Sequence, residues 1–161
     1  MSDISENENS AIIESENVNS EKYMIFSVLD KLYGFPSRQI SEIAIFDAVY
    51  PLPLLPPYVL GVINRYSVPY ALFDIAQMLY RTPGKRNKIL VFKDEIDRVA
   101  ILIDDISGIA DVPEQELLLI ERSSESNDST ESISASFNWE GNDVLVLDIE
   151  SILKRVTQET A

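Results

Sequence analysis

Carboxylates are the potentially reactive groups that this sequence supplies most plainly, and Asp104 and Asp105 form an adjacent pair. Such a pair could hold a hard cation, or act as a general acid and a general base. Neighbouring residues on a β-strand point to opposite faces, so the two side chains are not expected to converge on one substrate. We expect a polar strand end here. A small enzyme that uses Asp104 or Asp105 is the alternative.

The absence of histidine and cysteine limits the other catalytic and metal-binding chemistry that this chain could perform. The chain has no histidine and no cysteine, and only five glycines. It therefore lacks the commonest metal ligand, the usual base of serine and cysteine hydrolases, and any thiolate or disulfide. Neither the glycine-rich phosphate-binding motifs nor the G-x-S-x-G nucleophile motif occurs. We predict no catalytic residues, no cofactor and no metal site, and hence no enzyme.

The charge of the chain is uneven. Its 161 residues carry a net charge of −14; residues 1–21 hold six acidic and no basic residues, and residues 121–132 hold four acidic and one basic. Such segments bury too little apolar surface to offset the entropy of ordering them. We expect an acidic disordered tail over 1–20, a mobile acidic, serine-rich loop over about 121–134, and a short tail over 158–161. A phosphorylation or docking role for the loop is the alternative.

The same composition bears on partners and location. An acidic chain repels phosphate backbones and anionic lipids, so neither nucleic acid nor a membrane surface is an expected partner. The start MSDISENENS lacks the basic and apolar regions of a signal peptide. No apolar run approaches the length that crosses a bilayer. We expect a cytoplasmic protein without direct membrane insertion.

The rest of the chain has the pattern of short β-strands separated by turns. We expect strands at 22–29, 32–35, 38–46, 59–64, 68–73, 88–92, 98–103, 106–112, 133–139 and 143–147. Four prolines within residues 51–57 predict a stiff connector. Helices over 75–80 and 149–156 follow Asp74 and Asp148, which can cap their first turns. The pattern predicts an all-β fold with a short C-terminal helix.

Two further groups of side chains could bind a partner. Tyr66, Tyr70 and Phe73 could stack on bases, although packing inside a β-barrel is the simpler expectation. The basic segment TPGKRNK, residues 82–88, could bind an acidic partner, although a solvated loop is the simpler expectation. Neither group by itself defines a function.

Five stretches in sequence order resemble CheW-like domains: YMIFSVLDKLYGFPSRQISEIA, PLPLLPPYVLGVIN, ALFDI, VAILIDDISGIADV and DVLVLDIESIL. The resemblance covers about residues 21–157. It implies one CheW-like domain of two small five-stranded, SH3-like β-barrels that share a core. It also implies a non-enzymatic chemotaxis adaptor, which couples the cytoplasmic helical tips of methyl-accepting chemoreceptors to the regulatory domain of the CheA histidine kinase in membrane-associated receptor arrays.

The resemblance also implies a protein-binding surface. In the family, a helical hairpin of the receptor lies in the groove between the barrels, and the matching positions here include Ile40, Glu42 and Gly61. Glu42 lies two residues from Ile40, which places both on one face of a regular strand. The alternatives are that Ile40 is a core residue and that Gly61 marks close backbone packing or a bulge.

The turn at Asn64, Arg65, Tyr66 and Ser67 departs from the family, which usually has Asn-Leu-Arg-Gly there. Aligned without a gap, the family's arginine, which is important for coupling, falls on Tyr66 and its glycine falls on Ser67. Tyr66 cannot supply the charge, and Arg65 would face the other side of a regular strand. We therefore expect an altered partner contact. The alternative function is a divergent paralogue that scaffolds a histidine kinase in a parallel chemosensory pathway, or without direct receptor contact.

Overall fold

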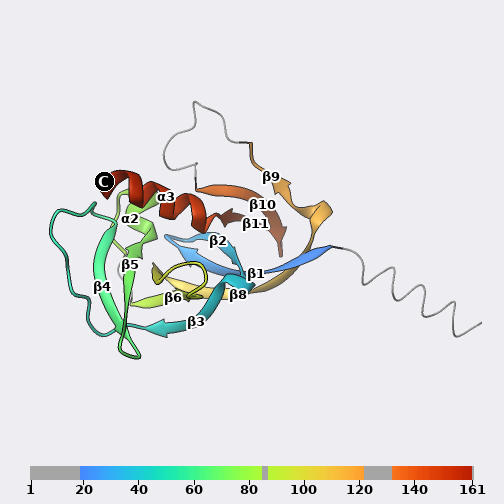
Figure 1. The fold of residues 1–161 in the computed structure, drawn as a ribbon. Helices are drawn as coiled ribbons and strands as arrows, with labels where there is room; N and C mark the ends of the chain where they lie inside the picture. The colour runs from blue at the N-terminus through green and yellow to red at the C-terminus, as the bar shows by residue number, and fades with distance from the viewer. Residues whose placement is uncertain (1–18, 85–86, 122–131, 161) are drawn as a thin grey trace, which may run out of the picture.

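The computed structural model describes residues 19–84, 87–121 and 132–160, whose strands form two sheets (Figure 1). The first sheet has the order β8-β1-β2-β11-β10-β9 and the second has the order β3-β6-β7-β5-β4. The strands of the first sheet are β1 Ser20–Val28, β2 Lys31–Pro36, β8 Asp105–Pro113, β9 Leu118–Leu119, β10 Ile133–Trp139 and β11 Asn142–Leu147. Those of the second are β3 Ile40–Ile45, β4 Val59–Arg65, β5 Val68–Asp74, β6 Lys88–Phe92 and β7 Val99–Ile103. The helices are α2 Ile75–Tyr80 and α3 Ile149–Thr160, with short 3₁₀ turns η1 Ser37–Gln39 and η2 Glu114–Glu116.

The predicted all-β class and the C-terminal helix are confirmed, but the sheets are not closed barrels. Within the described residues the two outer strands of each sheet do not pair with each other. The helix α3 runs to Thr160, through most of the segment expected as a C-terminal tail. The strand β10 begins at Ile133, inside the expected loop over 121–134, while residues 1–18 and 122–131 lie outside the described residues.

The hairpins β1–β2, β4–β5 and β10–β11 each reverse direction through two residues with positive φ, which is the arrangement of a type I′ turn. The right-handed twist of the strands favours this turn. The turn residues are Leu29–Asp30, Tyr66–Ser67 and Glu140–Gly141. The first turn therefore lies one residue earlier than the expected turn at residues 30–31.

The apolar side chains form three clusters, and the largest lies between the two sheets. The other two lie within the first sheet and within the second sheet. Because neighbouring residues of a strand point to opposite faces, Ile25 of β1 joins the cluster of the first sheet while Phe26 joins the shared cluster. On β7, Ala100 and Ile101 divide in the same way. Strands β1 and β7 are thus buried on both faces.

Aromatic side chains connect the sheets across the shared core. Phe35 of β2 meets Phe92 of β6 edge to face, with ring centroids 4.9 Å apart. Phe26 stacks beside Phe35 with centroids 5.6 Å apart. Full burial of such a side chain stabilises the fold by about 1.5–3 kcal/mol, so the sheets are held as one unit.

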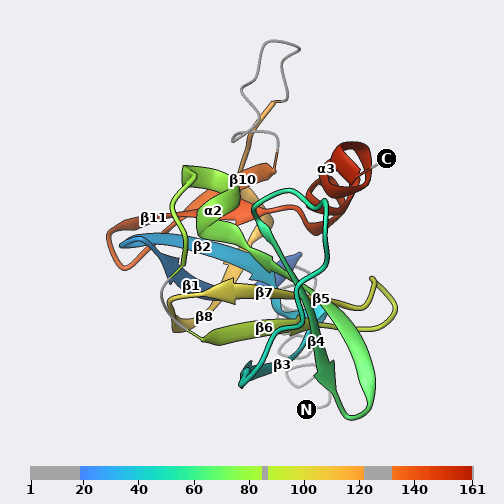
Figure 2. The same ribbon diagram turned by 90° about the vertical axis from the view of Figure 1, so that its left-hand side faces the viewer.

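Both helices lie over the sheets and begin at the predicted aspartate caps (Figures 1 and 2). The buried Asp74 carboxylate accepts hydrogen bonds from the backbone N–H groups of Ala76 at 3.1 Å and Gln77 at 3.3 Å. It also accepts one from Gly84 at 2.7 Å, which fixes the chain beyond α2. Asp148 accepts from Glu150 at 3.2 Å. Both predicted caps are confirmed.

Gly61 lies beneath the proline-rich connector. Tyr50 of the connector exchanges backbone hydrogen bonds with Val62 at 2.8 and 2.9 Å. Gly61 has φ +139°, and a Cβ at this residue would lie 2.2 Å from the carbonyl oxygen of Tyr50. The β4–β5 register also shifts between Val59 and Gly61. The alternative expectation for Gly61, close backbone packing at a bulge, is confirmed.

We predict that Gly61→Ala lowers the free energy of unfolding by about 3 kcal/mol, because a new methyl group meets backbone and φ is unfavourable for alanine. Urea unfolding followed by circular dichroism measures the loss. Gly141→Ala is the matched control, since Gly141 has φ +84° with no heavy atom within 4 Å of a built Cβ. The control should lose only about 1 kcal/mol. Equal losses would contradict the close-packing role of Gly61.

Candidate protein-binding site

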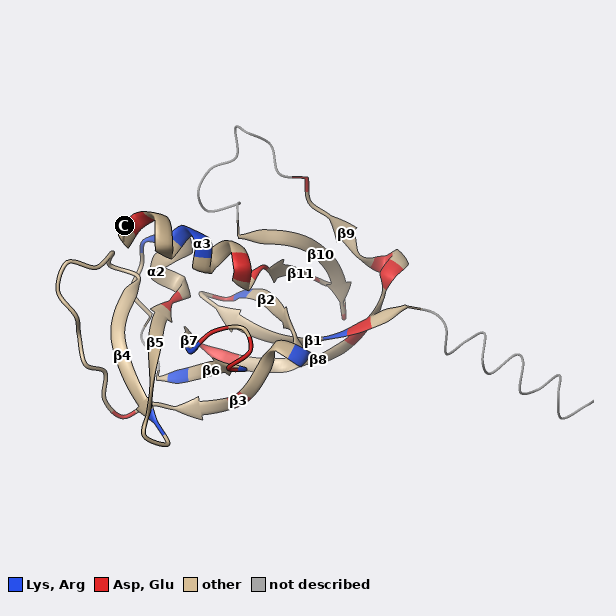
Figure 3. Cartoon of the chain, in the orientation of Figure 1, with Lys and Arg blue, Asp and Glu red and all other residues tan. Residues whose placement is uncertain are grey.

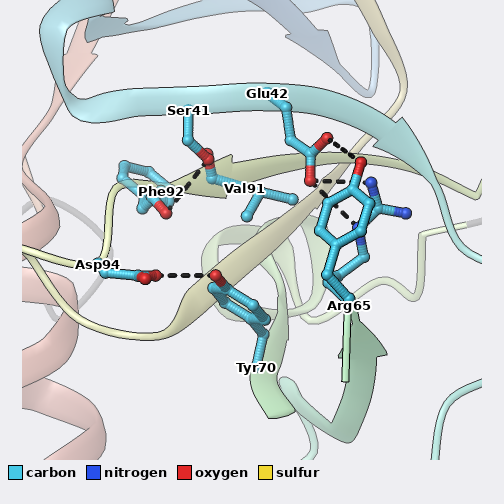
Figure 4. Close-up of polar contacts among 8 residues, drawn as sticks. Ser41, Glu42, Arg65, Tyr70, Val91, Phe92 and Asp94 are labelled. Carbon is cyan, nitrogen blue, oxygen red and sulfur yellow. Dashed lines mark hydrogen bonds and ion pairs between the residues drawn. The ribbon is translucent and has the colours of Figure 1, made fainter. Parts of the chain in front are cut away.

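An ion pair joins the two edges of the second sheet. Glu42 lies on the edge strand β3, and Arg65 is the last residue of the opposite edge strand β4. The Arg65 guanidinium donates to Glu42 Oε1 from Nη2 at 2.8 Å and from Nε at 3.2 Å (Figure 4). The sheet is therefore curled so far that a side-chain contact, and no backbone ladder, connects its edges.

The neighbouring tyrosine adds two contacts to this ion pair. The Arg65 guanidinium carbon lies 5.1 Å from the centroid of the Tyr66 ring, which is the geometry of a cation–π contact. The Tyr66 hydroxyl donates a long hydrogen bond of 3.5 Å to Glu42 Oε2. The hydrogen bond to Glu42 raises the pKa of Arg65 above its ordinary value. The carboxylate and the ring thus both stabilise the charged guanidinium.

Alternation along β4 explains why Arg65 can reach Glu42. Ile63 lies two residues earlier and is buried in the cluster of the second sheet, so Arg65 points to that inner face. On a regular strand the side chain of residue 65 would face away from that of residue 66, although a turn relaxes this rule. In the structure, Arg65 faces Glu42 and forms an ion pair with it. Tyr66, in the turn, contacts the same carboxylate through its hydroxyl.

Ile40 and Glu42 lie on opposite faces of β3, so the expectation that they share a face is wrong. The register shifts between them: Ile40 pairs with Phe92, and Glu42 pairs with the adjacent Val91. Phe92 belongs to the shared core and Val91 to the cluster of the second sheet. A β-bulge at Ser41 causes the reversal. Ile40 is a buried member of the shared core.

The expected site residues thus fall in three places. Glu42, Arg65 and Tyr66 are in contact with one another, and the exposed residues Asn64 and Ser67 lie beside them on the same hairpin. Ile40 and Gly61 are buried, the first in the shared core and the second beneath the connector.

Exposed isoleucines that the sequence pattern did not single out lie on an edge strand of each sheet, two on β3 and one on β8. We call Ile43, Ile45 and Ile109 the isoleucine strip; these residues are 44%, 58% and 61% exposed. Ile43 pairs with Leu90 of the shared core, and Ile109 pairs with Met24, which packs against that core. Directly paired residues point to the same face of a sheet, so the strip continues the shared core to the surface.

Two ion pairs bracket the isoleucine strip. Arg38, just before β3, pairs with Glu21 of β1 at 2.6 Å. At the other end Lys88, the partner of Ile45, pairs with Asp105 at the start of β8 at 2.5 Å. One ion pair links η1 to β1 beside the start of β3, and the other links β6 to β8 beside the end of β3, so both ends of this edge strand lie near charged side chains.

Asp104 and Asp105 have separate structural contacts. Asp104 Oδ2 accepts from the backbone N–H of Leu29 at 2.7 Å and so fixes the β1–β2 turn. Asp105 pairs with Lys88 and accepts from the Ile106 N–H at 2.9 Å. In the described ranges 19–84, 87–121 and 132–160, no group of three or more acidic residues is placed to hold a metal ion.

The other candidate groups do not form a joint site. Phe73 lies in the shared core, whereas Tyr70 packs against the cluster of the second sheet. The tyrosines and Phe73 therefore make no common stacking platform. Residues 85–86 of the basic segment lie outside the described residues.

Comparisons with known proteins agree with this architecture. Residues 22–157 match the family model of the CheW-like domain. The crystal structure of the scaffolding protein TtCheW from Thermoanaerobacter tengcongensis is similar in fold, with a TM-score of 0.69 at 15% sequence identity over 81% of this chain and 90% of that chain. A search of the curated proteins found no match.

Since the matched residues make up most of the chain, the protein belongs to the CheW-like family, a family of chemotaxis scaffold and adaptor domains. The resemblance inferred from the five sequence stretches is confirmed.

We predict that Glu42 and Arg65 couple by about 1 kcal/mol in a double-mutant cycle of Glu42→Ala and Arg65→Ala, measured by urea unfolding. Their side chains are only 29% and 22% exposed, so solvent screens the pair incompletely. The control pair, Glu21 and Arg38, is 35% and 69% exposed and should couple by about 0–0.5 kcal/mol. A coupling no larger than that of the control would contradict the role of the pair as an edge contact.

We predict that Ser67→Gly raises the free energy of unfolding by about 0.5–1 kcal/mol. Ser67 has φ +65°, a conformation that glycine adopts without the steric cost of a Cβ, and this gain exceeds the added chain entropy. Thermal and urea unfolding measure the change. Ser136→Gly, inside β10, should instead destabilise the protein. Destabilisation by both changes would refute a strained turn at Ser67.

Proposed function

We propose that this protein is a non-enzymatic adaptor, which couples the cytoplasmic helical tip of a methyl-accepting chemoreceptor to the regulatory domain of a CheA-type histidine kinase. Membership of the CheW-like family supports the class of function. The observation that carries the receptor contact is the isoleucine strip, an exposed continuation of the shared core between two ion pairs.

The isoleucine strip has the chemistry that recognises an amphipathic helix. Such a helix lays its apolar face against apolar side chains and leaves its polar flanks at the rim. The ion pairs Arg38–Glu21 and Lys88–Asp105 lie at the ends of β3, where they can contact those flanks. The receptor tip is itself helical, so it is the partner that we propose for this strip.

The kinase contact is proposed from family membership, with Asn64, Arg65, Tyr66 and Ser67 as a second candidate surface. These residues lie on the β4–β5 hairpin, which projects from the second sheet in Figure 2. Binding through both surfaces would recruit the protein from the cytoplasm to membrane-associated receptor arrays. In the described part of the chain, no helix is long and apolar enough to cross a membrane.

We predict that Ile45→Glu and Ile109→Glu each weaken binding to a soluble receptor-tip hairpin at least about tenfold in titration calorimetry. A carboxylate held in an apolar contact without a partner costs more than the 1.4 kcal/mol that corresponds to a factor of ten. Leu119→Glu is the matched control, because Leu119 is 78% exposed on β9, away from the strip. Binding of the control should be unchanged.

The same titrations with the CheA regulatory domain separate the functions. Unchanged kinase binding by the strip variants would support two separate surfaces. Binding of the wild-type protein to the kinase domain alone would favour the divergent paralogue that scaffolds a kinase without receptor contact. Binding to neither would contradict the adaptor function.

A further inference from the structure

A hollow of about 380 Å³ lies beside the Glu42–Arg65 ion pair. Glu42 and Ser41 of β3 form one side, Tyr66 and Tyr70 of the β4–β5 hairpin form another, and residues 93–95 of the β6–β7 turn complete it. Glu42 points to the inner face of the second sheet, whereas the isoleucine strip lies on the face toward the first sheet. The hollow is therefore separate from the proposed receptor contact.

The charges that line this hollow favour a cation. They comprise three carboxylates, from Glu42, Asp94 and Glu95, and one ammonium group, from Lys93. Arg65 neutralises the charge of Glu42. Of the remaining lining residues, two are negative, Asp94 and Glu95, and one is positive, Lys93, so negative charge is in excess. The acidic β6–β7 turn is drawn as a red loop beside β6 in Figure 3.

Two aromatic rings give the hollow a second recognition element. Tyr66 is 83% exposed, and it occupies a turn position with φ +52° that a tyrosine rarely adopts. Beyond its contacts with Arg65 and Glu42, most of this ring is open to a partner. Arg65 covers one side of the Tyr66 ring.

The second ring is held in place by the acidic turn. The Tyr70 hydroxyl donates to Asp94 Oδ1 at 2.8 Å, as Figure 4 shows. This hydrogen bond fixes the ring relative to one oxygen of Asp94, and a carboxylate can accept further hydrogen bonds. The hollow thus combines an ordered carboxylate with aromatic surface.

We propose that this hollow binds an arginine side chain presented by a protein partner. A guanidinium group stacks on an aromatic ring and donates to carboxylates in a planar fork, so it satisfies both elements at once. A lysine ammonium can also lie over a ring, but it is a compact, strongly hydrated charge that cannot stack flat or donate to a carboxylate in a planar fork, so it fits the hollow less well. The hollow shares Tyr66 with the candidate surface for the kinase, so the proposal adds a specific contact to that surface, and its failure would leave the isoleucine strip and its partner unaffected.

The test is a titration of the ¹⁵N-labelled full-length protein with N-acetyl-arginine methylamide, followed by amide chemical shifts. N-acetyl-citrulline methylamide is the matched neutral probe, and N-acetyl-lysine methylamide is the matched compact cation. We expect saturable shifts at residues 66–70 and 93–95 with the arginine probe, weaker ones with the lysine probe and none with the citrulline probe.

Variants locate the binding. Tyr66→Asn removes the ring and keeps a residue that tolerates positive φ, so the turn is preserved. Asp94→Asn removes a charge and keeps an acceptor for the Tyr70 hydroxyl. Each should weaken the arginine probe about two- to fivefold, as expected for the loss of one cation–π or carboxylate contact. Glu116→Gln, at the exposed η2 turn, is the control and should change nothing.

Two results would overturn the proposal. Equal shifts with citrulline would show that charge is not recognised. Arginine-induced shifts that also appear at the acidic residues Glu114, Glu116 and Glu121 and persist in Tyr66→Asn would show general attraction to an acidic protein.

Discussion

The apolar cluster shared by the two sheets is the constraint on which the rest of the structure depends. Strands β1 and β7 are buried on both faces because each contributes alternate residues to this cluster and to the core of its own sheet. The two sheets therefore cannot separate without exposing the shared apolar cluster to solvent. The isoleucine strip is exposed because β3 and β8 are edge strands, on which Ile43 and Ile109 pair with residues in or against this cluster and remain open to solvent, as does Ile45.

The second sheet presents different chemistry on its two faces. On the face toward the first sheet, apolar side chains continue the shared core. On the inner face, the Glu42–Arg65 pair connects the two edge strands, and the tyrosines with the β6–β7 turn surround a hollow. The bulge at Ser41 produces this division, because it places Ile40 in the core and turns Glu42 to the other face. One edge strand thereby contributes to two candidate surfaces.

Much of the fold could be predicted from the sequence, because alternation, turn residues and helix caps are local properties. Strand positions and the caps at Asp74 and Asp148 followed from such signals. The faces of β3 could not be predicted, since a bulge at Ser41 leaves no clear mark in an isoleucine-rich segment. The contact between Arg65 and Glu42 depends on the curl of the whole sheet, and the two-residue strand β9 is too short to show a period. Because the bulge could not be predicted, the sequence indicated Ile40 as a surface residue and did not indicate Ile43 and Ile45.

Amide hydrogen exchange, measured by mass spectrometry with and without a soluble receptor-tip hairpin, tests the central claim most directly. The claim is that two sheets fixed by a shared core present the isoleucine strip as a ready-made helix-binding surface. A bound helix should then slow exchange in β3 and β8 and leave β9 unchanged, without altering the deeply buried strands β1 and β7. Slower exchange concentrated in β9, or none in β3 and β8 at saturating receptor tip, would contradict the claim.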